Sequence, residues 1–324
     1  MSQVDVIIPC YKYAHYLAAC VESATSQDGV DVRALVIDDA SPDDTPSVAA
    51  RLTAQDPRVE YRRHTTNRGH IATYNEGLEW ASGDYVLLLS ADDLLIPGAL
   101  GRAARLMDAH PNVGLTYGKE VVLRSDGTPP PPPPIERPGE WTIVAGEDFI
   151  EQICASSKNL VPTPTAIART SVQKRIGGYR AELTHSGDME MWLRFGANAD
   201  VGVVNAYQAY YRKHGENMAR GYSWPKDFAQ RKAAFDSMFR EHGARLTRRD
   251  ALATLADRNL AQAALFRARS EFDEGHTDAT RELMAFARTL WPDAPASEVW
   301  SRLVWKQRLG PVWPLIRRVR SSVR

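Results

Sequence analysis

The chain has 324 residues, of which 44% are hydrophobic and 25% are charged, an ordinary composition for a globular protein with one α/β domain and an appended segment. The 40 basic and 40 acidic residues balance, so bulk charge gives no reason to expect nucleic-acid binding. Three sparse, irregularly spaced cysteines argue against a disulfide framework and against a zinc site.

Strand and helix signals alternate through the first half of the chain. Short apolar runs, typical of strands buried in parallel sheets, alternate with segments of helical periodicity. The predicted strands are 4–9, 34–37, 59–61, 85–89 and 113–123, and the predicted helices are 17–24, 45–55, 71–81 and 97–109. Repeated strand–helix units predict an α/β fold with an open, mostly parallel sheet flanked by helices, whose ligands bind near the carboxyl ends of the strands.

The second half of the chain changes character twice. Six consecutive prolines at 129–134 cannot enter a sheet or a helix interior, so we expect a stiff surface loop, with an SH3-type ligand as the alternative. Residues 149–214 are expected to add helices and loops. Beyond residue 224, helices rich in Ala, Leu and Arg are predicted at 228–242, 249–268 and 277–290.

The last twenty residues, 305–324, contain several Lys and Arg residues and no acid, interleaved with apolar side chains. A basic amphipathic end can lie on an anionic membrane surface, and a solvated or partner-packed tail is the alternative. We see no signal-peptide pattern and no run of about 20 apolar residues. We therefore expect a cytoplasmic protein with reduced thiols, peripheral at the inner face of the membrane if the tail binds lipid.

Two acidic pairs, Asp38–Asp39 and Asp92–Asp93, directly follow predicted buried strands. Adjacent carboxylates repel each other unless a cation lies between or near them, and Mg²⁺ or Mn²⁺ commonly binds one or two carboxylates together with substrate phosphates. Each pair alone is a weak signal. Helix capping is the alternative for Asp92–Asp93, because Pro97 opens a predicted helix shortly afterwards.

Several segments follow one another in a specific order: Val6–Lys12, Val36–Thr45, Asn67–Gly69, Asn75–Gly77, Gly83–Asp93, Gly187–Arg194 and Tyr211–Met218. As a set they resemble the motifs of family 2 glycosyltransferases of the GT-A fold. The resemblance covers about residues 4–220. It implies a catalytic domain over 1–222, with a nucleotide-binding half at 1–125 and an acceptor half at 135–222, followed by a helical extension at 223–324.

The resemblance implies a nucleotide-diphosphate sugar as donor, with a uracil base the usual case. The loop of Pro9 and Tyr11 would hold the nucleoside together with Asp39, which would reach the base. Asp92 would contact the ribose or the diphosphate. The acceptor would be a hydroxyl of a carbohydrate or glycolipid, and family members invert the anomeric centre.

The resemblance also implies the residues of the reaction itself. Asp93 would bind a divalent cation, Mn²⁺ or Mg²⁺, His214 would touch that metal or the diphosphate, and Asp188 would be the general base. The chemistry calls for these parts, because the leaving diphosphate gains negative charge and the acceptor hydroxyl must lose a proton. The alternative for Asp188 is simple helix capping.

The chain departs from the family pattern at Ser90 and Gly187, where many members carry an acid, and at Tyr74, where Arg is frequent. These departures leave a non-catalytic nucleotide-sugar-binding or partner-binding module as the alternative function. A sugar-nucleotide pyrophosphorylase is disfavoured because residues 10–13 do not form a glycine-rich loop. A dehydrogenase is disfavoured because no Gly-x-Gly-x-x-Gly follows the first strand.

Overall fold

The computed structural model describes residues 1–124, 129–134, 141–215 and 222–309, and the chain divides into two compact units. The first unit comprises residues 1–150 and 159–220, and the second comprises residues 151–158 and 221–324. A short segment from the middle of the chain belongs to the second unit, and the expected domain boundary between residues 222 and 223 remains a prediction. The division of the first unit into nucleotide and acceptor halves remains a prediction.

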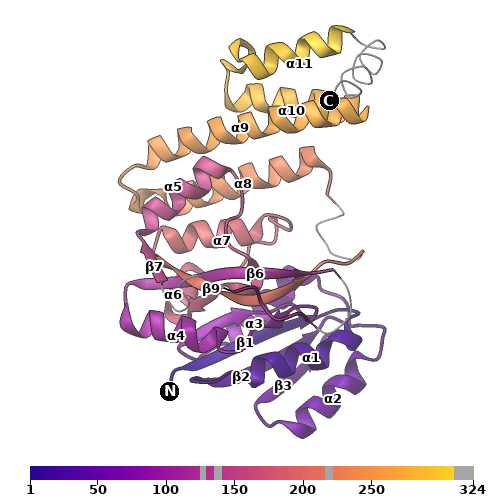
Figure 1. Cartoon of the computed structure of the whole chain (residues 1–324), viewed down its shortest axis with the longest axis vertical. Helices are drawn as coiled ribbons and strands as arrows, with labels where there is room; N and C mark the ends of the chain where they lie inside the picture. The colour runs from indigo at the N-terminus through magenta and orange to yellow at the C-terminus, as the bar shows by residue number, and fades with distance from the viewer. Residues whose placement is uncertain (125–128, 135–140, 216–221, 310–324) are drawn as a thin grey trace. The chain divides into compact units, whose positions relative to one another are not determined.

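A nine-stranded sheet forms the first unit, in the order β3-β2-β1-β4-β8-β6-β9-β5, with β7 paired to β9 (Figure 1). The strands are β1 (Gln3–Cys10), β2 (Asp31–Asp38), β3 (Val59–Arg63), β4 (Tyr85–Leu88), β5 (Leu94–Leu95), β6 (Val113–Leu123), β7 (Trp141–Val144), β8 (Ile167–Arg169) and β9 (Asp200–Arg212). β3, β2, β1 and β4 run parallel to one another, and β6 runs parallel to β9. The expected open, mostly parallel sheet is confirmed.

The sequence prediction missed β8 and β9, which lie where only helices and loops were expected. β8 is three residues long and joins the sheet by antiparallel pairing with β4 and β6. β9 pairs with β6, β5 and β7, so its place in the sheet depends on partners far along the chain. The proline run at 129–134 has neither helix nor strand and is mostly exposed, as expected of a surface loop.

Helices cover the sheet because alternate strand residues point to opposite faces. The helices of the first unit are α1 (Ala14–Thr25), α2 (Thr45–Gln55), α3 (His70–Trp80), α4 (Ala99–Ala109), α6 (Thr170–Ile176) and α7 (Gly187–Gly196), and α5 (Gly146–Ser156) begins there. Val6 shares a buried cluster with Leu17 of α1 and Leu106 of α4. Its neighbour Ile7 faces the other way and packs on Gly77 of α3, where a Cβ atom would lie 2.2 Å from Ile7 Cγ2.

The second unit is helical, as expected, and contains α8 (Trp224–His242), α9 (Arg249–Glu274), α10 (Thr277–Leu290) and α11 (Glu298–Leu309). α9 ends at Glu274, and the C-cap Gly275, with a φ of 90°, turns the chain into α10. Leu260 and Leu283 are fully buried in this helical pair. None of the described helices has the length and apolar character needed to cross a lipid bilayer.

Candidate active site

The loops that follow β1, β2 and β4 meet at one edge of the sheet, because these strands are parallel neighbours. The main-chain N–H of Asp39 donates to the carbonyl of Cys10 at 3.0 Å, and the N–H of Ala91 donates to the carbonyl of Pro9 at 3.3 Å. Pro9 is half-buried at the end of β1, and the next loop exposes Tyr11. The predicted nucleoside residues and the acidic pair after β4 therefore lie along the same edge.

Asp39 is buried and organises the loop that follows β3. Its Oδ1 accepts hydrogen bonds from the Arg68 main-chain N–H at 2.7 Å and lies 2.7 Å from His64 Nδ1, and its Oδ2 accepts from the Gly69 N–H at 2.8 Å. The other ring nitrogen of His64 lies 3.0 Å from Glu76 Oε2. The carboxylate thus holds residues 64–69 in place, and Oδ2 keeps acceptor capacity for a further donor.

Asp92 and Asp93 are both buried and bind the end of β9, a strand that the sequence prediction missed. Asp93 Oδ1 accepts from the main-chain N–H of Arg212 at 2.9 Å, and the Arg212 guanidinium donates to the Asp92 carbonyl at 3.0 Å. His214 Nε2 lies 3.0 Å from Asp92 Oδ2. The Asp92–Asp93 pair and the predicted segment that carries His214 are therefore adjacent. The acidic pair does not cap α4, whose N-cap is Gly98.

The acidic pair has the character of a cation site. Burial raises the pKa of Asp93 well above its usual range, and the neighbouring charges of Asp92 and Glu120 raise it further. A divalent cation would relieve this unfavourable burial of negative charge. The Asp93 carboxylate and the His214 imidazole are suitable ligands, and two protein ligands leave positions for phosphate oxygens. The donor set therefore fits Mn²⁺ or Mg²⁺.

Among the described residues, the one group with three ligand atoms within 4.8 Å of one another lies elsewhere, at Glu271, Glu274 and His276 in the second unit. The guanidinium of Arg267 contacts both carboxylates of that group. We interpret it as an ion-pair cluster that fastens the turn between α9 and α10.

Asp188 lies in the first turn of α7, but its side chain is not used as a cap. The N-cap is Ser186, and α7 has no side-chain cap hydrogen bond. Instead Asp188 Oδ2 accepts from Thr163 Oγ1 at 2.8 Å, and the Tyr179 hydroxyl donates to the same carboxylate. Burial raises the pKa of Asp188, although these two hydrogen bonds oppose the shift. A carboxylate held in one orientation and made more basic by burial is suited to accept a proton.

The chain at and just before Tyr179 is held by two residues whose roles the sequence did not reveal. The Asn75 side chain donates to the Tyr179 carbonyl at 2.9 Å and accepts from the Tyr179 N–H at 2.6 Å. Arg194 of α7 donates to the carbonyls of residues 176–178 and pairs with Glu190, and both side chains are fully buried. The available signal in the sequence was the i, i+4 spacing of Glu190 and Arg194 in an otherwise apolar segment, because charged residues are rarely buried unless paired.

The charges of Asp188 and of the acidic pair after β4 influence the same two tyrosines. Burial raises the pKa of Tyr74, and the charges of Asp188, Asp92 and Asp93 raise it further. Burial and the same three charges, together with Glu120, raise the pKa of Tyr211 to about 12. All three carboxylates therefore act on the same two hydroxyl groups, although Asp188 is far from the others in the sequence.

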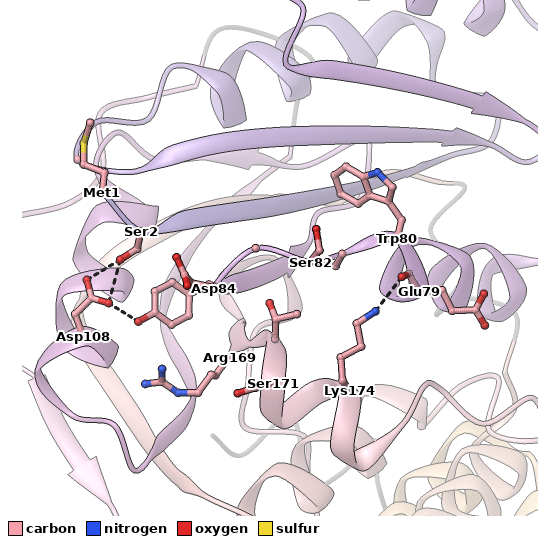
Figure 2. Close-up of a pocket in the computed structure, with 15 residues that line it drawn as sticks. Met1, Ser2, Glu79, Trp80, Ser82, Asp84, Asp108, Arg169, Ser171 and Lys174 are labelled. Carbon is pink, nitrogen blue, oxygen red and sulfur yellow. Dashed lines mark hydrogen bonds between the residues drawn. The ribbon is translucent and has the colours of Figure 1, made fainter.

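A cavity of about 1030 Å³ lies at the opposite edge of the sheet, where β1 and β4 begin (Figure 2). Three of its charged side chains already have partners. Asp108 accepts from the hydroxyls of Ser2 and Tyr85, Lys174 donates to two carbonyls of α3, and Arg169 donates to three main-chain oxygens. Since these groups stabilise the fold, we assign no chemistry to this cavity.

Comparisons with known proteins identify the family of the chain. Residues 5–172 match the family model described as glycosyl transferase family 2. The GalNAc(5)-diNAcBac-PP-undecaprenol beta-1,3-glucosyltransferase of Campylobacter jejuni is 37% identical over 101 residues, which are 31% of this chain and 33% of that protein. The succinoglycan biosynthesis protein ExoO of Rhizobium meliloti is 35% identical over 109 residues, 34% of this chain and 31% of that protein. The chain thus spans about a third of the length of these two relatives.

Among solved structures, a fragment of S. aureus TarS in complex with UDP-GlcNAc has a similar fold. The TM-score is 0.67 at 21% identity, and the match covers 98% of this chain and 87% of that one. This likeness concerns the fold alone and confirms the predicted GT-A fold class.

Proposed function

The chain belongs to glycosyltransferase family 2, and from that premise we propose that it transfers a sugar from a UDP-sugar donor to an acceptor hydroxyl with inversion at the anomeric carbon. One observation carries the proposal: Asp92, Asp93 and Asp188 act on the same two tyrosine hydroxyls at the carboxyl edge of the sheet. The groups proposed to serve the leaving diphosphate and the proposed base thus lie within electrostatic reach of the same two side chains. The UDP-GlcNAc of the TarS structure supports the choice of donor.

On the donor side, Tyr11 and Pro9 would contact the nucleoside, and Asp39 would accept a hydrogen bond from the base through the remaining capacity of its Oδ2. Asp92 would contact the ribose or the diphosphate. Asp93 would hold the divalent cation together with His214, whose Nε2 lies 3.0 Å from Asp92 Oδ2 in this structure. When bound, that cation would neutralise the charge that develops on the leaving diphosphate.

On the acceptor side, Asp188 would act as the general base. The acceptor oxygen attacks the anomeric carbon, its proton passes to the Asp188 carboxylate, and the bond from that carbon to the diphosphate oxygen breaks, leaving its electron pair on UDP. Thr163 and Tyr179 hold the carboxylate during the step. Because a single displacement forms no covalent enzyme intermediate, no nucleophilic side chain is required.

The proposal is tested by measuring UDP release from UDP-glucose, UDP-galactose, UDP-GlcNAc and UDP-GalNAc, with Mn²⁺, with Mg²⁺ and with EDTA. We expect metal-dependent release from one donor, and a rise in melting temperature when that donor and the metal are both present. Metal-dependent UDP binding without release from any donor would favour the alternative, a non-catalytic nucleotide-sugar-binding or partner-binding module. Absence of any metal-dependent shift with a nucleotide diphosphate would refute both.

We place the reaction in the assembly of a cell-surface polysaccharide or glycoconjugate, on the support of the succinoglycan and undecaprenol-linked relatives. A carbohydrate or glycolipid acceptor would suit peripheral membrane contact through residues 305–324. Residues 310–324 lie outside the described part of the chain. Within the described part, Trp305 is 52% exposed, but Lys306 is buried and pairs with Asp273, so that cation does not belong to a lipid-facing surface.

The membrane contact is tested by flotation of the full chain with vesicles of neutral lipid or of neutral and anionic lipid mixed. Binding to the anionic vesicles alone, lost at high salt and on removal of residues 310–324, is expected. Equal recovery of the full and shortened chains with the anionic vesicles would refute the contact.

A further inference from the structure

Tyr74 occupies a fixed position beside the proposed base. It lies on α3, one turn after His70, and its ring meets the Tyr179 ring edge-on at 5.3 Å and the His70 ring at 5.4 Å between centroids. The next residue, Asn75, bonds both main-chain groups of Tyr179. The ring is therefore held between a helix and the loop whose tyrosine donates to Asp188.

The charges of three acidic side chains of the site influence the hydroxyl group of Tyr74. Asp188, Asp92 and Asp93 each act on it electrostatically. Within the described part of the chain, this hydroxyl has no hydrogen-bond partner. A phenol with an ordinary pKa of about 10 is protonated at neutral pH, so this hydroxyl is a hydrogen-bond donor available to a ligand.

In-line attack places the transferred sugar between the base and the leaving diphosphate. The Tyr74 ring packs on Tyr179 at the base, and its hydroxyl also feels the charges of Asp92 and Asp93. Resting on the proposed function, we propose that the Tyr74 hydroxyl donates a hydrogen bond to an oxygen of the transferred sugar. Tyr74 would then be a specificity-determining residue that distinguishes donors by their sugar, whereas the nucleotide is bound by other residues.

The test compares Tyr74→Phe with the wild-type chain and with Tyr117→Phe as a matched control. Tyr117 is half-buried on β6, and burial is the one resolved cause that raises its pKa, so its hydroxyl lies outside the influence of the three carboxylates. The phenylalanine at position 74 keeps the ring contacts with Tyr179 and His70. The measurements are the melting temperature, the Kd of UDP with Mn²⁺, and kcat/KM for UDP release from the donor that the wild type uses.

We expect Tyr74→Phe to lower kcat/KM for the UDP-sugar about 5- to 30-fold, with the Kd of UDP and the melting temperature unchanged. The control should match the wild type in all three. Equal loss of UDP and UDP-sugar binding would move the contact to the diphosphate and overturn the inference. An unchanged kcat/KM would overturn it while leaving the proposed function intact, and a wild type that uses no UDP-sugar would overturn both.

Discussion

Replacement of Asp188 by Asn tests the assignment of the base most directly. Asn has nearly the same size and shape and keeps an oxygen that can accept from Thr163 and Tyr179, so the local packing should survive. What the substitution removes is the negative charge and the ability to accept a proton. The donor residues lie on other loops, so UDP should still bind.

The expected loss follows from that single change. A positioned general base contributes about 10²- to 10⁴-fold to the rate, which corresponds to about 3–5.5 kcal/mol of activation free energy. The folding stability of the variant should equal or exceed that of the wild type at neutral pH. Burial raises the pKa of Asp188, so the folded chain binds that proton more tightly than the unfolded chain does. The stability of the wild type therefore falls as pH rises through the window between the ordinary and the raised pKa, and the neutral Asn avoids this cost.

The assay measures UDP release at saturating donor, the Kd of UDP by calorimetry, and the melting temperature, each between pH 4 and pH 8. For the wild type, activity should be lost as pH falls through the raised pKa of Asp188, because the protonated carboxyl cannot accept a proton. For Asp188→Asn, release should be at or near background, UDP affinity retained, and the melting temperature at pH 7 equal or higher.

The reasoning would be refuted by a variant that releases UDP within about tenfold of the wild-type rate, since that is less than the smallest loss expected of a general base. A folded Asp188→Asn chain that no longer binds UDP would also contradict it, by placing this carboxylate on the donor side.

Three further substitutions test the metal site, the helix–sheet contact and the support of α7. Asp93→Ala should weaken UDP binding at least about tenfold in Mn²⁺ and leave the Kd in EDTA unchanged; calorimetry that shows equal loss in both would contradict metal ligation. Gly77→Ala should lower the free energy of unfolding, because overpacking against the fully buried Ile7 costs about 1–3 kcal/mol, more than the gain in helix propensity. Denaturant unfolding measures this loss, and an unchanged transition midpoint would contradict the prediction. Glu190→Gln should lower the free energy of unfolding by about 3–5 kcal/mol in the same experiment, because it leaves the buried Arg194 without its counter-charge. A loss under about 1 kcal/mol would contradict this, by showing that the main-chain carbonyls alone stabilise the buried guanidinium.

The fold class and one edge of the site could be predicted because their signals are local. Residues 4–9, 34–37 and 85–89 read as buried strands from a few consecutive apolar residues, and all three are strands in the structure. Once these strands are parallel neighbours, topology alone brings Asp39 and Asp93 to the same edge. The motif order identified the family for the same reason, since each motif is a short contiguous segment.

Other features were decided by contacts between distant parts of the chain. β9 was not foreseen, because its place depends on pairing with β6 rather than on its own pattern. That pairing brings Arg212 to Asp93. In the same way, no sequence pattern connects Asp188 with Thr163, or Tyr74 with Tyr179.

The amino-acid sequence by itself therefore determined which residue types are present and where most strands and helices of the first half of the chain start, within a few positions. Only the tertiary structure decided which side chains meet. Long-range pairing and packing orient a carboxylate toward a hydroxyl, and they gain free energy from the whole fold rather than from neighbouring residues. For that reason Asp188 could be named from its motif, whereas the two hydroxyl groups that hold it could not.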